Sequence, residues 1–161
     1  MSDELYNTRI LRLATRIPFT ARLDAPQASV SRTSRICGSR LVMDANFDDA
    51  GRIRELGLDV RACALGQAAT ALVAPKLIGL AREEIAPAAQ AFAAMLDDDG
   101  PVPPPPWSEL EIFLPVREHR ARRGAVMLVF EAALAACDAA AAARRLSVPP
   151  DRDAGCSPAS A

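Results

Sequence analysis

The fold is decided by residues 41–60, which read LVMDANFDDAGRIRELGLDV. The first part alternates apolar and more polar side chains with a period of two, which is typical of a strand that buries one face. The group Asp48-Asp49-Ala50-Gly51 is a turn signal, and a second extended run covers Ile53 to Val60. The apolar phase shifts within this second run, which predicts a β-bulge near Arg54 or Glu55. The stretch is therefore interpreted as a β-hairpin.

A weaker alternation from Val30 to Ile36 predicts a strand before the hairpin, so that the three strands form an antiparallel meander. On both sides of this sheet the apolar spacing is helical. The predicted helices cover Glu4–Ile17, Leu65–Leu77, Arg82–Leu96, Ser108–Phe113 and Val116–Arg145. Ser108 is expected to cap the short fourth helix, which Pro115 ends. The sequence thus predicts an α+β fold, in which helices pack on a three-stranded antiparallel sheet, with an N-terminal helix and a long C-terminal helix.

The composition fits one domain over residues 1–146, followed by a disordered tail over residues 147–161. Of the 161 residues, 50% are hydrophobic and 24% are charged, and the net charge is −1 from 19 basic and 20 acidic side chains. This balance argues against a nucleic-acid partner, which needs a basic excess on one face. The acidic N-terminus lacks a signal-peptide pattern, and apolar runs such as Ala86–Leu96 are too short to cross a bilayer. A cytoplasmic protein without a membrane partner is therefore expected.

The sequence contains four cysteines, which are Cys37, Cys63, Cys137 and Cys156. The absence of any Cys-x-x-Cys spacing and the presence of a single histidine argue against a closed four-ligand zinc site. A two-residue hairpin loop at Asp49–Ala50, followed by one bulged residue, would bring Cys37 beside Cys63 at the open end of the hairpin. Cys137 lies on the apolar face of a predicted helix and Cys156 lies in the tail, so neither is expected to share this site.

The predicted pair of thiols lies in surroundings that favour the thiolate form. Cys63 precedes a helix, whose dipole and free N–H groups favour a thiolate, and Arg35, Arg40 and Arg61 add positive charge nearby. Two thiols in one electropositive pocket suit the binding of a soft metal or the transfer of sulfur. From the residues alone, the alternative is that both cysteines are small buried hydrophobes.

Three motifs resemble the N-terminal iron–sulfur scaffold family of IscU and NifU. They are Cys37-Gly38-Ser39, the turn from Asp48 to Ile53, and the start of a small-residue helix from Ala62 to Ala71. The resemblance covers roughly residues 5–143. It implies an iron–sulfur cluster assembly scaffold or carrier, without enzymatic turnover, that binds iron or a [2Fe–2S] cluster through Cys37 and Cys63. It also implies that zinc can occupy the same thiols, and that the partners are a cysteine desulfurase and apo iron–sulfur proteins.

The sequence departs from the family pattern at two places. Ser39 stands where the family has an aspartate, and Gly124-Ala125 stands where it has a histidine and a third cysteine. Small residues at these last two positions predict a pocket that is open on that side. The departures keep two alternatives open: a sulfur acceptor similar to the SufE family, with Cys63 expected to carry the persulfide, or a binding module with the scaffold fold that has lost the cluster.

Overall fold

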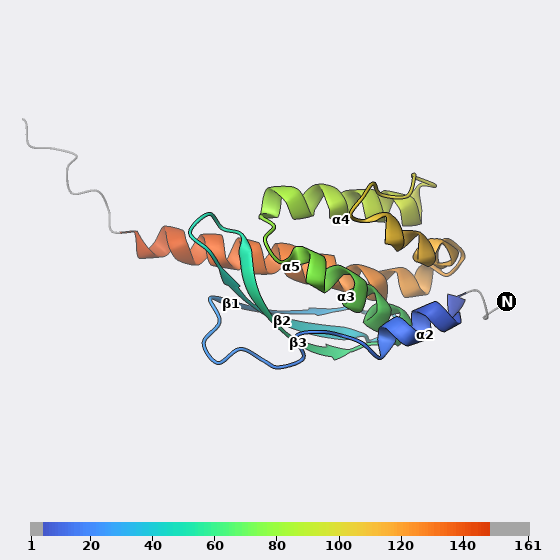
Figure 1. The fold of residues 1–161 in the computed structure, drawn as a ribbon, viewed down its shortest axis with the longest axis horizontal. Helices are drawn as coiled ribbons and strands as arrows, with labels where there is room; N and C mark the ends of the chain where they lie inside the picture. Colours follow the sequence, from blue (N-terminus) through green and yellow to red (C-terminus); the bar gives the residue numbers. More distant parts are fainter. Residues whose placement is uncertain (1–4, 149–161) are drawn as a thin grey trace, which may run out of the picture.

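The computed structural model describes residues 5–148 and has the predicted α+β architecture (Figure 1). Its helices and strands are α2 (Thr8–Ala14), β1 (Ala28–Thr33), β2 (Arg40–Phe47), β3 (Ile53–Arg61), α3 (Ala64–Leu77), α4 (Arg82–Asp97), the 3-10 helix η1 (Ser108–Glu118) and α5 (Arg120–Ser147). The prediction of a three-stranded antiparallel sheet with helices, an N-terminal helix and a long C-terminal helix is confirmed. Residues 149–161, which include most of the predicted tail and Cys156, lie outside the described residues.

The sheet has the strand order β1-β2-β3, and both pairs are antiparallel. The predicted bulge is present, because Asn46 pairs with Glu55 and Phe47 pairs with Ile53, which leaves Arg54 without an opposite residue. The predicted two-residue loop is wrong. The loop is longer, because the Asp48 carboxylate accepts hydrogen bonds from the backbone N–H groups of both Ala50 and Arg52 and closes it.

Strand β2 is buried on both faces, since Leu41 to Ala45 are all buried. Helix α5 packs against β1 and β2 on one face, with α3 and α4 packed on α5 (Figure 1). On the other side the chain at residues 19–23 lies against the sheet, where Leu58 N–H donates to Phe19 O at 2.7 Å. Gly57 permits this close approach, because a Cβ there would lie 2.6 Å from the Ala21 carbonyl oxygen.

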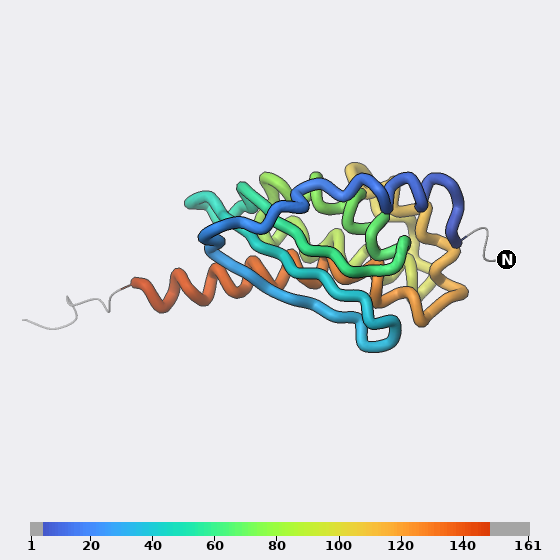
Figure 2. Tube along the Cα trace, turned by 90° about the horizontal axis from the view of Figure 1, so that it is seen from below, coloured from blue at the N-terminus to red at the C-terminus, as the bar shows by residue number. Residues whose placement is uncertain are grey.

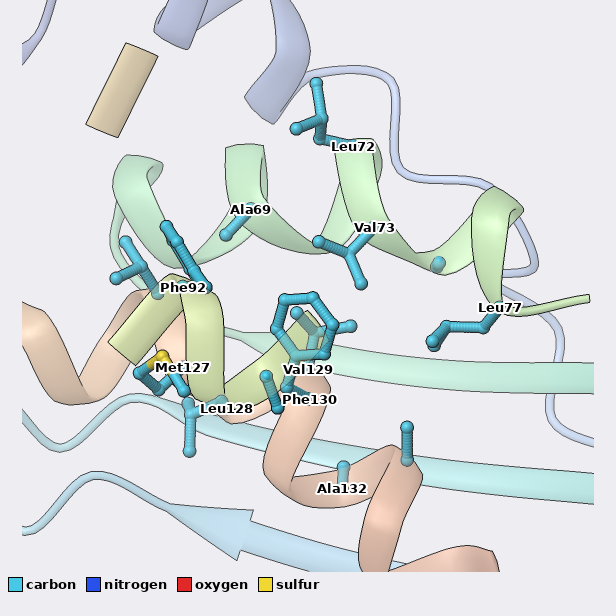
Figure 3. Close-up of a cluster of buried hydrophobic side chains, with 14 of the residues drawn as sticks. Ala69, Leu72, Val73, Leu77, Phe92, Met127, Leu128, Val129, Phe130 and Ala132 are labelled. Atoms are coloured by element: carbon cyan, nitrogen blue, oxygen red, sulfur yellow. The ribbon is translucent and has the colours of Figure 1, made fainter. Parts of the chain in front are cut away.

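The hydrophobic core lies between the sheet and helices α3, α4 and α5, and Figure 3 shows the part of it where apolar side chains of the three helices meet. Phe92 and Phe130 are 5.9 Å apart between ring centroids, and Trp107 lies 5.3 Å from Phe130. Helix α5 is long and apolar enough to cross a membrane by length and composition, but 61% of its apolar window is buried within the protein. It is therefore the central core helix of this fold, and the prediction that Cys137 belongs to the core is confirmed.

The segment around Pro115 also differs from the prediction. The expected short helix from Ser108 extends through Pro115 to Glu118 in 3-10 form, and its N-cap is Trp107 without a side-chain hydrogen bond. The capping role of Ser108 was therefore wrong, and α5 begins only at Arg120. Pro115 is consistent with both differences, because it has no N–H for an i→i−4 bond and would interrupt an α-helix at this point.

Candidate functional site

Cys37 and Cys63 line one cavity at the end of the sheet, where the β1–β2 turn meets the beginning of α3. The cavity has a volume of about 310 Å³ and is lined by Cys37, Gly38, Ser39, Arg61, Ala62, Cys63 and Gln67. The sheet register alone does not place the two cysteines opposite each other, because the ladder ends at the pair Arg40 and Arg61. The turn after β1 brings Cys37 to the site.

The β1–β2 turn holds Cys37 in a fixed backbone geometry. Strand β1 ends at Thr33 rather than continuing to Ile36, because Ser34 N–H donates to Ser39 O and Gly38 N–H donates to Ser34 O, both at 2.8 Å. Gly38 has φ +72°, a left-handed conformation that glycine adopts without strain. Gly38 thus allows the sharp turn by which the chain enters β2.

Ser39 links the two cysteines. Its side chain is only 4% exposed, its Oγ lies 3.2 Å from Cys37 Sγ, and it accepts a hydrogen bond from Cys63 N–H at 3.3 Å. Since this Oγ already accepts from one side, its single hydrogen is available to a Cys37 thiolate on the other. One hydroxyl therefore connects the turn that carries the first thiol to the residue that carries the second.

The surroundings of Cys37 favour its thiolate. Burial raises the pKa of Cys37, but hydrogen bonds to the hydroxyls of Ser34 and Ser39, the backbone of Ser39 and the positive charge of Arg122 outweigh it, so that the pKa lies below its ordinary value. The sequence favoured Cys63 as the thiolate because of its place at a helix start. Cys63 is indeed the N-cap of α3, without a side-chain capping bond.

The positive charge near the thiols comes only in part from the predicted arginines. Arg61 lines the cavity, whereas the Arg40 Nε donates to Ser31 Oγ at 3.2 Å and does not line it. Arg122, at the beginning of α5, and Ser34 act on Cys37 but were not predicted as site residues. The sequence signal for Arg122 was the arginine-rich run at residues 120–123.

The expected opening beside Gly124 and Ala125 is absent. A Cβ on Gly124 would lie 2.5 Å from Ser34 Oγ, and Ala125 is 1% exposed and packs against Gly66. These residues are small because α5 approaches the β1–β2 turn and α3 closely. The prediction of free space on this side was therefore wrong.

The site offers two strong ligands rather than three. Within residues 5–148, no group of three or more His, Cys, Asp or Glu side chains lies close enough together to hold a metal ion. Cys137 lines a different cavity with Phe47 and Arg82, and burial raises its pKa to about 11. It is a core thiol and does not complete the pair.

Comparison with solved structures identifies relatives of the whole chain. The N-terminal domain of a nitrogen-fixing NifU-like protein from Brucella abortus is 31% identical to this chain, with a TM-score of 0.82, and the alignment covers 87% of this chain and 96% of that one. The chain belongs to the NifU-like N-terminal domain family. The resemblance drawn from the motifs is confirmed.

A second solved structure shares the NifU-like fold at lower identity. It is a putative iron–sulfur cluster assembly scaffold protein for the SUF system from Fervidobacterium islandicum AW-1, 17% identical with a TM-score of 0.76. The alignment covers 85% of this NifU-like chain and 99% of that protein, and at this identity it shows the fold alone. No family model and no curated protein matches the sequence.

Proposed function

We propose that this NifU-like domain is an iron–sulfur cluster assembly scaffold or carrier that takes iron, or a [2Fe–2S] cluster, at Cys37 and Cys63. One observation carries the proposal: both cysteines line one cavity, and the Ser39 hydroxyl contacts both residues. Membership in the NifU-like family supports it. The domain acts in the cytoplasm as an accessory without turnover of its own, and its partners are a cysteine desulfurase and apo iron–sulfur proteins.

The thiol pair sets how the cargo is held. Thiolates are the ligands that iron–sulfur clusters take in proteins, and a [2Fe–2S] cluster normally takes four protein ligands. Cys37 and Cys63 supply two of them. The remaining ligands come from outside this thiol pair, from a partner protein, a second subunit or a small thiol, which suits a carrier that passes its cargo on. Zinc is also a suitable ion for the two thiolates.

A second candidate function is sulfur acceptance, and the lowered pKa of Cys37 favours it. The Cys37 thiolate would attack the outer sulfur of a persulfide on the desulfurase. A new S–S bond to Cys37 forms as the S–S bond of the donor breaks, and the donor cysteine leaves as a thiolate. The net oxidation state of the sulfur pair is conserved, so the step needs no further oxidant or reductant.

Anaerobic reconstitution with ferrous iron and sulfide tests the first function. Cys37→Ser and Cys63→Ser are each expected to abolish the thiolate-to-iron absorption bands, because neither thiol has a replacement. Cys137→Ala is the matched control, since Cys137 lies in the core away from the cavity. Wild-type spectra in both single variants would contradict the proposal.

Labelled-sulfur transfer from a desulfurase, with and without iron, separates the two functions. A sulfur acceptor is expected to label on Cys37 without iron, and Cys37→Ser alone is expected to stop the transfer. A cluster scaffold requires iron and both thiols. Labelling that persists in Cys37→Ser would contradict the second function.

A further inference from the structure

An exposed isoleucine stands at the tip of the turn that carries the first thiol. Ile36 is 77% exposed, although it is a large apolar side chain, and among the described residues only Leu146 near the end of α5 is a more exposed large hydrophobic. The turn projects from the body of the molecule beside the beginning of α5 (Figure 2). Its two backbone hydrogen bonds and the glycine at φ +72° fix the turn, so Ile36 is presented on a structured support.

Arginines with little ion pairing lie near this isoleucine. Arg35 precedes it, and Arg122 lies in the first turn of α5, which packs so closely on the β1–β2 turn that a Cβ on Gly124 would lie 2.5 Å from Ser34 Oγ. Within residues 5–148 neither arginine has a carboxylate at ion-pair distance. Arg61, on the cavity wall, has only a long contact of 3.8 Å with Asp59, between two largely exposed side chains.

Other arginines close by in the sequence do form ion pairs. Arg117 and Arg123 flank the same part of the chain, and they pair with Asp99 at 3.4 Å and with Asp97 at 2.5 Å, respectively. The arginines that face acidic residues of α4 and the loop after it are therefore neutralised within the domain. Those that face the thiol cavity keep their charge available to another molecule.

We propose that Arg35, Ile36, Arg61 and Arg122, here named the Ile36 face, dock a sulfur-donating protein whose contact surface has an apolar notch ringed by carboxylates. The proposal rests on the proposed function for the sulfur chemistry at Cys37, and it adds the residues that choose the partner. Ile36 fills the notch, the arginines pair with the carboxylates, and the Cys37 thiol next to Ile36 faces the donor.

The positive charge of the Ile36 face favours an acidic partner protein over a second copy of this chain. A symmetric dimer through the Ile36 face would place the same arginines of both copies against each other, since a two-fold interface uses one patch on both subunits. Like charges across an interface disfavour association, whereas an acidic partner is attracted and steered to the site. The interaction is therefore expected to weaken as salt is added.

The test measures binding of a purified cysteine desulfurase from the same organism by calorimetry at low and high salt. Ile36→Ser is expected to weaken binding by about tenfold or more, as truncation of a central apolar anchor does, and Arg35→Glu is expected to weaken it at low salt. The matched controls are Leu146→Ser, another highly exposed apolar residue, and Arg145→Glu, an exposed arginine on the far part of α5. Neither control is expected to change the affinity.

Partner-free loading with ferrous iron and sulfide separates failure of this proposal from failure of the proposed function. Loss of desulfurase binding in Ile36→Ser, with wild-type loading, supports the Ile36 face. Wild-type binding by Ile36→Ser, absence of any binding by the wild-type chain, or a homodimer that Ile36→Ser disrupts would overturn it. If the wild-type chain does not load but Ile36→Ser still loses binding, the scaffold function fails and the docking face stands.

Discussion

Replacing Ser39 by alanine tests how the two cysteines are coupled. The Ser39 Oγ lies 3.2 Å from Cys37 Sγ and accepts from Cys63 N–H at 3.3 Å, and the substitution removes both interactions. The N–H···O distance is long and the thiol is a weak hydrogen-bonding group, so the expected loss in the free energy of unfolding is about 1–2 kcal/mol, at the low end for a buried group that loses its partner. For a domain of this size, the melting temperature should fall by roughly 2–8 °C.

The same variant should also raise the pKa of Cys37. Burial already raises that pKa, and without the Ser39 hydroxyl fewer donors oppose it. The alkylation rate of Cys37 with iodoacetamide, followed by mass spectrometry across a pH series, should show its midpoint at a higher pH and a slower reaction at neutral pH. Ser147→Ala is the control, because the Ser147 Oγ contacts only a carbonyl on the exposed end of α5. An unchanged midpoint together with unchanged stability would refute the coupling through Ser39.

Three further predictions concern the scaffold around the site. Asp44→Asn should lower the free energy of unfolding by about 1–3 kcal/mol, because the buried carboxylate accepts a hydrogen bond from Arg22 at 2.6 Å. Burial raises the pKa of Asp44, but its hydrogen bonds lower that pKa more. The stabilisation by Asp44 should therefore be complete at a pH above the ordinary carboxyl range and be lost as the pH falls below that range, which urea melts at decreasing pH would measure. Gly124→Ala should destabilise the protein by about 1–3 kcal/mol in thermal melts, because the new Cβ would displace the Ser34 hydroxyl. Cys137, with its pKa raised to about 11 by burial, should resist alkylation at neutral pH until the protein unfolds; early labelling would contradict its core position.

The parts of the fold that depend on local patterns could be predicted from the sequence. The alternation in β2, the turn after Phe47 and the helical spacing of α3 to α5 all arise from side chains close together in the chain. The hairpin loop differed because the Asp48 carboxylate closes a longer turn than the two-residue loop. The residue types at a turn do not alone determine its length, because a side-chain oxygen can accept the hydrogen bonds that close the turn in place of a backbone carbonyl.

The sequence singled out two cysteines that line one cavity in the structure, but not the residues around them. Their pairing was predicted from a two-residue hairpin loop that the structure does not have, and the β1–β2 turn is what carries Cys37 to the cavity. Ser34 and Arg122 act on Cys37 because α5 packs on the β1–β2 turn, and Gly124 is small for the same reason. Contacts between segments this far apart depend on tertiary packing, which neither periodicity nor motif spacing encodes.

The claim that Cys37 and Cys63 act as one site is tested most directly by the iron that four proteins retain after reconstitution and challenge with a chelator: the wild type, Cys37→Ser, Cys63→Ser and the double variant. The proposed site predicts that each single substitution lowers the retained iron as much as the double substitution, since two ligands that bind one cargo are not additive. Independent, additive effects of the two substitutions, or iron retention by either single variant equal to that of the wild type, would contradict it.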